Sequence, residues 1–350
     1  MTARLPKYSI SLLALTSVFF LLVFIDNYYP AGKIVAKTEL CMGTIVEIKV
    51  PCEKKKDEPA FGAIIDEALS EVKRVEGLFS VYRDDSEVSK INSLKAGEEL
   101  VLSEEVFALI EKSIEYSRLT SGAFDITVKP LVDLWKEAKK KNMPLAEDVA
   151  RLLNSVGYDK VVLNREKRSI MFTVDGMGLD FGGIAKGYTS AMAMKILKDS
   201  GIKDAIVNPG GEMFCMGRKS AREMWRVGIK HPRAGGILFE IRLKDKAIAT
   251  SGDYERFFVV DGRRYSHIID PRSGYPVGDD VVSATVIADD PVVTDIIATA
   301  LVISGEPGLK IAENMPGVDA LLIIRSGKKL RTVTTKDFGE KYYVVAKDKL

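Results

Sequence analysis

The chain has 350 residues, of which 46% are hydrophobic and 29% are charged, and its formal net charge is +2. This composition predicts a globular protein with a sizeable core, in one large domain or two closely packed halves. The two short lysine runs, 54–56 and 139–141, have acidic residues nearby and no interleaved aromatic side chains. Nucleic acid is therefore excluded as an expected partner.

The N-terminal segment predicts attachment to a membrane. An uncharged stretch, residues 8–25, follows Arg4 and Lys7 and precedes Asp26. As a helix it would span roughly 27 Å, close to the hydrocarbon thickness of a bilayer. No small-residue cleavage pattern follows it, and the flanking charges place the amino end inside. We predict a transmembrane anchor with its linker over residues 1–32 and a catalytic body on the periplasmic or extracellular side of the cytoplasmic (inner) membrane. A cleaved signal peptide and a buried core helix are the alternatives.

The three cysteines do not form a disulfide framework, because their number is odd. Cys41 and Cys52 flank a predicted strand at 44–50. Extended chain of this length places their Cα atoms roughly 36 Å apart, whereas a disulfide needs them within about 7 Å. We predict that they do not pair.

The hydrophobic periodicity predicts one body of mixed helices and strands after a linker at 26–40. Ser103 is a candidate N-cap, and the following helix closes at Ser121-Gly122. Because short turns join most strands, the predicted fold class is α+β with antiparallel sheets. In chain order, the predicted elements are a strand at 44–50, helices at 60–78, 103–119, 130–140 and 145–153, a hairpin at 161–163 and 170–174, a helix at 183–201, strands at 205–208, 225–229, 238–243, 247–250, 264–268 and 281–287, a helix at 291–303, and strands at 320–324 and 342–345.

A glycine pair provides the first candidate site. Gly182 and Gly183 open the predicted helix at 183–201, and the free N–H groups of a helix N-terminus favour an anion such as phosphate. Asp180 before the turn would hold a ribose hydroxyl or a metal-bound water, and Lys186 would hold a phosphate. Alternatively, Asp180 is an ordinary N-cap and the glycines only permit close helix packing.

A second candidate site lies on the helix at 291–303. Asp295 and Thr299 are four residues apart and therefore share one helix face. Their carboxylate and hydroxyl oxygens are ligands that Mg²⁺ or Ca²⁺ prefers. Alternatively, Thr299 bonds its own helix and Asp295 only favours the helix dipole.

Histidine is scarce, with only His231 and His267 in the chain. His267 begins a segment rich in Asp, Pro and Gly, which suits the rim of a cleft, although a structural role is the alternative. Similar turn-forming clusters occur at 122–127, 208–212 and 250–254.

Taken together and in register, these motifs resemble the ApbE family of FAD:protein FMN transferases. The resemblance extends over residues 36–345 and implies an ApbE-like α+β domain, related to the T-fold, over 33–350. The segments that carry it are Met42-Gly43-Thr44, 79–83, 86–92, 122–127 with Pro130-Leu131 and Leu134-Trp135, 180–187, 208–211, 251–253, 267–271 and the Asp295/Thr299 pair. Two positions depart from the usual family pattern: Glu212 stands where Asp is common, and Pro209 where an aliphatic residue is usual.

The resemblance also implies the role of each candidate residue. Mg²⁺ would be held by the carbonyl oxygen of Gly183 and the side chains of Asp295 and Thr299. Catalysis would depend on His267, Lys186 and Asp180. The residues implied to bind FAD are Met42, Tyr82, Ala123, Phe124, Asp125, Asp180, Lys186, Ser251, Asp253 and His267.

The reaction implied by the resemblance is the attack of an acceptor hydroxyl on the FMN phosphorus of FAD, with AMP leaving. Mg²⁺ and helix N–H groups would stabilise the developing charge, and His267 would take the hydroxyl proton. The implied partner carries a Ser/Thr-Gly-Ala-Ser/Thr motif, as in a subunit of a sodium-pumping NADH:quinone reductase (Nqr) or an Rnf-type complex. The alternatives are an Mg²⁺-dependent FAD pyrophosphatase that yields FMN and AMP, and an FAD-binding protein without turnover.

Overall fold

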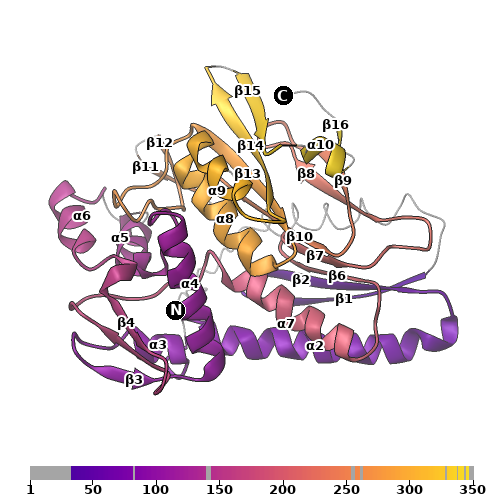
Figure 1. Ribbon diagram of the computed structural model, residues 1–350, viewed down its shortest axis with the longest axis horizontal. Coiled ribbons are helices and arrows are strands. Elements are labelled where there is room, and N and C mark those ends of the chain that lie inside the picture. The colour runs from indigo at the N-terminus through magenta and orange to yellow at the C-terminus, as the bar shows by residue number, and fades with distance from the viewer. Residues whose placement is uncertain are drawn as a thin grey trace, which may run out of the picture.

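A large antiparallel sheet lies at the centre of the computed structural model (Figure 1). The structure describes residues 33–81, 83–138, 143–253, 257–260, 263–327, 329–336, 338–342 and 344–346. Every neighbouring pair of strands in this sheet is antiparallel, which confirms the predicted antiparallel α+β class. The strands are, in spatial order, β1 (Lys33–Cys41), β2 (Thr44–Cys52), β6 (Ala205–Pro209), β7 (Met213–Met216), β10 (Lys246–Gly252), β13 (Val281–Ala288), β14 (Asp319–Ser326) and β15 (Lys329–Thr334).

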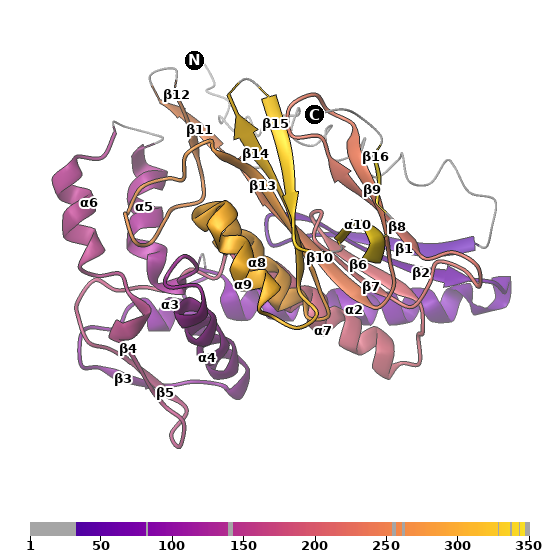
Figure 2. The same cartoon turned by 45° about the horizontal axis from the view of Figure 1, so that its top comes forward.

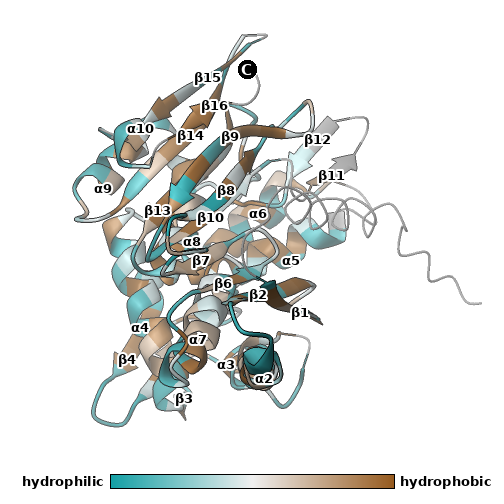
Figure 3. Ribbon diagram, turned by 90° about the vertical axis from the view of Figure 1, so that its right-hand side faces the viewer, coloured by the Kyte–Doolittle hydropathy of each residue, from teal (hydrophilic) through white to brown (hydrophobic). Residues whose placement is uncertain are grey.

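Three long helices cover one face of this sheet, namely α2 (Glu58–Phe79), α7 (Ala185–Asp199) and α8 (Pro291–Ser304). Helix α2 packs on β1 and β2, α7 on β6 and β7, and α8 on β10 and β13. Along β14, Ala320 and Leu322 join the hydrophobic cluster of α8, whereas Leu321 and Ile323 join a cluster on the other face. This alternation is the period of two that a sheet buried on both faces requires, and Figure 3 shows hydrophobic residues along β13 and β14.

A second layer covers the opposite face of the sheet. It contains a three-stranded sheet of β8 (Trp225–Lys230), β9 (Ile237–Leu243) and β16 (Val345–Ala346), with the short helix α10 (Phe338–Lys341). Buried side chains of β8 and β9 pack against β10, β13 and β14. The central sheet is therefore sandwiched, and its inner residues are excluded from water on both sides.

A smaller lobe stands at one end of the central sheet, beside α2 (Figures 1 and 2). Ser103 Oγ accepts a hydrogen bond from Val106 N at 3.4 Å, which confirms the predicted N-cap. The predicted hairpin and the helices at 103–119, 130–140 and 145–153 are confirmed here with small shifts of their ends. The lobe contains α3 (Glu87–Ile91), α4 (Glu104–Leu119), α5 (Lys129–Ala138), α6 (Ala146–Leu153) and a sheet of β3 (Glu99–Val101), β5 (Ser169–Phe172) and β4 (Val161–Asn164).

Shorter elements connect these parts. The strands β11 (Phe257–Val260) and β12 (Arg263–Ser266) form a separate antiparallel pair, and α9 (Leu309–Glu313) follows α8. Four 3-10 turns are η1 (Lys55–Asp57), η2 (Ile126–Val128), η3 (Tyr158–Lys160) and η4 (Glu306–Gly308).

Several predicted boundaries were wrong. The linker predicted at 26–40 is a strand from Lys33 onwards, because β1 pairs with β2 along its whole length. The strand predicted at 342–345 is wrong at Tyr342, which directly follows α10, although its carbonyl accepts a hydrogen bond from Arg242 N of β9 at 3.0 Å. Among the described residues, the strand β16 that pairs with β9 is Val345–Ala346. Helix α7 begins at Ala185, two residues later than predicted, because a turn occupies the glycine pair.

The three cysteines are buried, and none forms a disulfide, which confirms that Cys41 and Cys52 do not pair. The anchor predicted at 8–25 lies outside the described residues. Within the ranges that the structure describes, no helix combines the length and apolar character needed to cross a membrane.

Candidate functional site

The turn before α7 is held from both sides by side chains. Asp180 Oδ1 accepts a hydrogen bond from Gly182 N at 2.7 Å. The amide of Asn92 clasps the backbone of Leu179, accepting from its N–H at 2.6 Å and donating to its carbonyl at 3.0 Å. The sequence folds locally in this way because an Asp two residues before a glycine forms such a turn readily.

Two N–H groups in the first turn of α7 already donate hydrogen bonds within the protein. The N–H of Ala185 donates to Phe181 O at 2.8 Å, and that of Gly187 donates to Asp295 Oδ2 at 2.7 Å. The predicted anion site at this helix N-terminus would therefore depend on Lys186 and the remaining groups of the turn. Gly187 permits the contact with α8, since a Cβ there would lie 2.1 Å from Pro291 O.

Two carboxylates and one ammonium group meet beside this turn. Asp295 is 4% exposed, and its Oδ1 has no hydrogen-bond partner in the described part of the chain. Glu212 pairs with Lys186 Nζ through Oε1, and its buried Oε2 likewise lacks a described partner. Burial raises the pKa of Asp295 well above its usual value, the negative charge of Glu212 raises it further, and Lys186 opposes both. Burying a carboxylate oxygen without a hydrogen-bond partner costs free energy, and a bound cation would offset that cost. This arrangement therefore fits a bound cation.

The other oxygen donors predicted for the metal lie next to this centre. Thr299 is one turn beyond Asp295 on the same face of α8, and its Oγ1 is 3.4 Å from Ser251 Oγ. A Cβ placed on Gly183 would lie 3.4 Å from Thr299 Oγ1 and 3.4 Å from the ring of Phe124. Gly183, Asp295 and Thr299 therefore converge, and their carbonyl, carboxylate and hydroxyl oxygens suit Mg²⁺.

The described residues contain no group of three or more His, Cys, Asp or Glu side chains arranged to hold a metal. A metal at Asp295 would consequently draw on backbone and hydroxyl oxygens as well as carboxylates.

Asp125 organises the loop that carries Ala123 and Phe124. Its Oδ1 accepts from Thr127 N at 2.8 Å and Thr127 Oγ1 at 2.7 Å, and its Oδ2 accepts from Tyr158 N at 2.8 Å. Burial raises the pKa of Asp125, and these donors oppose the shift. Ala123 and Phe124 are buried. The FAD contact predicted for Asp125 remains a prediction, beside a role in fixing this loop.

Met42 connects the turn between β1 and β2 to α7. Its N–H donates to Glu76 Oε1 at 2.5 Å, and its Sδ accepts from Thr189 Oγ1 at 2.9 Å. Thr189 lies one turn after Lys186 on α7. Met42 is therefore placed beside the helix that carries the candidate phosphate ligand.

Asp253 and His267 come from the end of β10 and from the segment after β12. Asp253 is buried and forms two hydrogen bonds with the guanidinium of Arg233, at 2.9 and 2.5 Å. His267 is exposed, and its neighbour Ile268 packs in the same hydrophobic cluster as Phe124. Tyr82, also predicted to bind FAD, lies outside the described residues.

The comparisons with known proteins identify the family of this chain. The sequence profile of the ApbE family matches residues 42–322. The chain belongs to the ApbE family.

The ApbE relatives match over most of their length. A protein of Klebsiella pneumoniae (strain 342) named FAD:protein FMN transferase is 33% identical over 75% of this chain and 84% of its own. A Vibrio cholerae protein of the same name is 32% identical over 85% of this chain and 89% of its own. The predicted enzyme class, a transferase, is confirmed by these relatives.

Solved ApbE structures share the fold. The ApbE protein of Thermotoga maritima has a TM-score of 0.79 and 34% identity, covering 88% of this chain and 99% of its own. The flavinyl transferase ApbE of Pseudomonas stutzeri has a TM-score of 0.78 and 32% identity, covering 88% and 96%. The ApbE-like fold implied by the sequence motifs is thereby confirmed.

Sequence reasoning assigned no role to three residues that shape this candidate site. Asn92 bonds to the glycine turn, Arg233 neutralises Asp253, and Glu212 pairs with Lys186. Two of them had a signal in the sequence: Asn92 ends the segment 86–92 that carries the family resemblance, and Glu212 directly follows Gly210-Gly211 after a predicted strand.

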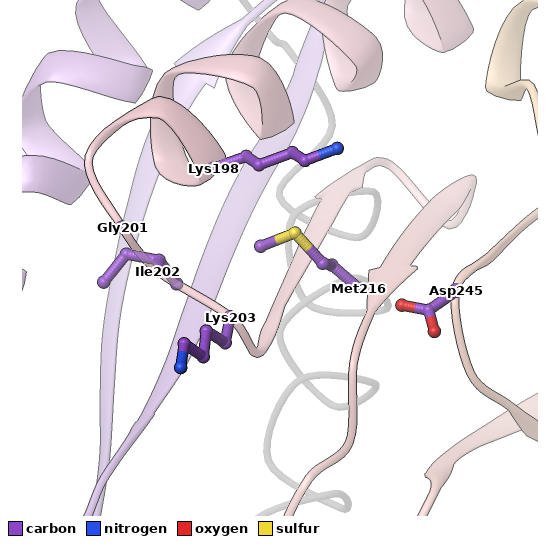
Figure 4. A pocket seen from close by; sticks show the side chains of 6 residues that line it. All are labelled: Lys198, Gly201, Ile202, Lys203, Met216 and Asp245. Atoms are coloured by element: carbon purple, nitrogen blue, oxygen red, sulfur yellow. The ribbon is translucent and has the colours of Figure 1, made fainter.

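A surface hollow of about 420 Å³ lies at the other end of α7 (Figure 4). Lys198, which lines it, is twelve residues beyond Lys186, about 18 Å along the helix axis. None of the predicted site residues lines this hollow, so it is separate from the candidate site. The lining residues are Lys198, Gly201, Ile202, Lys203, Met216 and Asp245.

Proposed function

We propose that this enzyme transfers the FMN half of FAD to a Ser or Thr hydroxyl of an acceptor protein and releases AMP, in a reaction that requires Mg²⁺. The observation that carries the proposal is the convergence of Asp295, Thr299, Gly183 and Lys186 at the first turn of α7. The relatives named FAD:protein FMN transferase support the substrate class.

The proposed step is a phosphoryl-type transfer. The acceptor oxygen forms a bond to the FMN phosphorus, the P–O bond to the AMP half breaks, and AMP leaves with the bridging oxygen. Mg²⁺, when bound, would neutralise charge on the pyrophosphate oxygens. Lys186 would add a positive charge beside the phosphate. The proton of the acceptor hydroxyl would pass to the imidazole of His267, a side-chain type suited to general-base catalysis.

The residues around the phosphate would position the substrate. Phe124, which contacts the Gly183 turn, presents a ring edge against which the flavin or adenine would pack. Asp180 would meet a ribose hydroxyl with the carboxylate oxygen that the turn does not use.

The acceptor is proposed to be another protein with a Ser/Thr-Gly-Ala-Ser/Thr motif, such as an Nqr or Rnf-type subunit outside the cytoplasmic membrane. The nearest match in this chain ends in Phe124, after Ser121-Gly122-Ala123. Because Phe124 is buried and has no hydroxyl, we expect no self-modification.

The experiment that tests the function incubates the chain with FAD, Mg²⁺ and an acceptor protein, followed by intact mass measurement and separation of nucleotides. The proposal expects one FMN on the acceptor and one AMP released. Free FMN with AMP would support the pyrophosphatase instead, and unchanged FAD would support a binding protein. FMN gained by the enzyme without an acceptor would contradict transfer to another protein.

We also propose that residues 1–25 attach the enzyme to the membrane, with the catalytic body outside. The chain beginning at Lys33 is expected in the soluble fraction with its FAD binding intact, and the full chain in the membrane fraction. Recovery of the shortened chain with the membrane would contradict the proposed anchor, and a mature N-terminus after Asp26 would establish a cleaved signal.

A further inference from the structure

Glu212 enters the site through a turn between β6 and β7. Gly210 and Gly211 have φ angles of 74° and 103°, a region that side chains rarely adopt. The N–H of Gly211 donates to Asn208 Oδ1 at 2.7 Å, and a Cβ on Gly210 would lie 2.4 Å from Thr44 Oγ1. The turn is therefore closely packed and fixes the direction in which the next residue leaves it.

The carboxylate of Glu212 faces two groups of the site at once. Its side chain is 12% exposed, and Oε1 pairs with Lys186 Nζ. Its second oxygen, Oε2, is buried without a described partner, as is Asp295 Oδ1, and the two carboxylates interact. Within the described residues no donor reaches either of these two buried oxygens, although the charge of Lys186 acts on Asp295.

We propose that Glu212 is a further positioning residue of the transfer reaction: Oε1 holds the ammonium of Lys186, and Oε2 and Asp295 Oδ1 together receive a divalent cation. This inference rests on the proposed function and extends its metal site to a second carboxylate. With both carboxylates charged, Lys186 balances one of them, and a divalent cation offsets the remaining negative charge. Without it, a buried excess negative charge would destabilise the folded site.

Substitution Glu212→Gln separates the two parts of the proposal. Glutamine keeps the length of the side chain and an oxygen for Lys186, but it loses the charge that attracts a cation. Glu212→Asp keeps the charge and shortens the side chain by one methylene.

Glu223 provides a matched control. Its Oε2 is also buried without a described partner, and it lies just before β8, in the layer on the opposite face of the central sheet. Glu223→Gln therefore makes the same chemical change away from the site.

The test is calorimetric titration of Mn²⁺ alone into the full chain and into each variant, after thermal melting has shown that each variant folds. We expect Glu212→Gln to raise the Mn²⁺ dissociation constant about 10–100-fold, Glu212→Asp to recover part of the loss, and Glu223→Gln to leave it unchanged. Steady-state kinetics of Glu212→Gln should show a lower kcat and a higher KM for FAD, recovered in part by Glu212→Asp.

Equal Mn²⁺ affinity in Glu212→Gln and Glu223→Gln would overturn the proposal. A lower melting temperature with unchanged affinity would do the same, since it would show a purely structural role. If Glu212→Gln does not fold, an unchanged Mn²⁺ affinity in Glu212→Asp together with unchanged kinetics would overturn it. Because Mn²⁺ binding needs neither FAD nor an acceptor, this result stays interpretable even if no FMN transfer is found.

Discussion

Two buried aspartates, Asp295 and Asp319, show how the same side chain serves different purposes in this molecule. They are 4% and 5% exposed, so burial does not distinguish them. Asp319 accepts from Lys341 Nζ at 2.8 Å, from Tyr342 Oη at 2.7 Å and from Thr335 Oγ1 at 3.3 Å. Asp295 has one described donor, Gly187 N, and one oxygen without any.

The two aspartates differ in whether the oxygens of their carboxylates all have hydrogen-bond donors. The donors of Asp319 attach α10 and the end of β15 to the start of β14, which makes this aspartate part of the scaffold. The unsatisfied oxygen of Asp295 lies in a cluster with Lys186 and Glu212, and a bound cation would offset the free-energy cost of burying it. Counting donors to a buried carboxylate therefore separates a structural group from a candidate binding group.

The largest expected effect is that of Asp295→Asn on activity. Asparagine keeps an oxygen for Gly187 N but removes the charge, so FMN transfer should fall about 10²–10³-fold. The melting temperature without divalent cations should stay equal or rise, because the repulsion from Glu212 is removed. Near-normal transfer at limiting Mg²⁺ would contradict the metal assignment, and a collapsed melting curve would assign Asp295 to the scaffold.

Asp319→Asn should lower stability and leave activity unchanged, the reverse of what is expected for Asp295→Asn. Its amide cannot accept from all three donors, and the half-exposed Lys341 would lose its charged partner, so stability should fall by about 2 kcal/mol. This corresponds to a melting temperature lower by roughly 3 °C. Transfer per folded molecule should be unchanged below the transition. A selective loss of Mg²⁺ dependence with normal stability would remove the contrast between the two aspartates.

Tyr342→Phe should lower the free energy of unfolding by a smaller amount, about 1 kcal/mol, because it removes the hydrogen bond to Asp319. Burial raises the pKa of Tyr342, and the bond to Asp319 raises it further. The folded state therefore keeps this proton longer than the unfolded chain does, so the associated stability is complete below the ordinary tyrosine value of 10.0 and is lost as pH rises above it. Melting curves should show a constant difference between the two proteins from neutral pH to about pH 9, and a shrinking one above pH 10. A difference that grows with alkaline pH would contradict this.

The parts of the fold that sequence predicts well are those with an internal pattern. Helix α2 carries a clear apolar periodicity and β13 is a strand buried on both faces, and their predicted spans agree with the structure. Two of the missed strands, β1 and β15, are the edges of the central sheet, where alternate side chains face water and the apolar signal is weak. The missed β7 lies inside the sheet but has four residues, too few to show a pattern.

The parts of the site that sequence predicts are the local ones. Asp295 and Thr299 share a helix face because they are four residues apart, which spacing alone establishes. The pairing of Lys186 with Glu212 and of Arg233 with Asp253 depends on strands and helices brought together only by the tertiary fold.

Thermal unfolding as a function of Mg²⁺ concentration tests the central claim most directly, using the wild type, Asp295→Asn and Asp319→Asn. A ligand that binds only the folded state raises its stability, by about 2.7 kcal/mol at a hundred times its dissociation constant. We predict that Mg²⁺ raises the melting temperature of the wild type and, from a lower starting value, of Asp319→Asn by the same amount, and leaves that of Asp295→Asn unchanged. Equal stabilisation of all three proteins would contradict the assignment of the unsatisfied Asp295 oxygen to a cation.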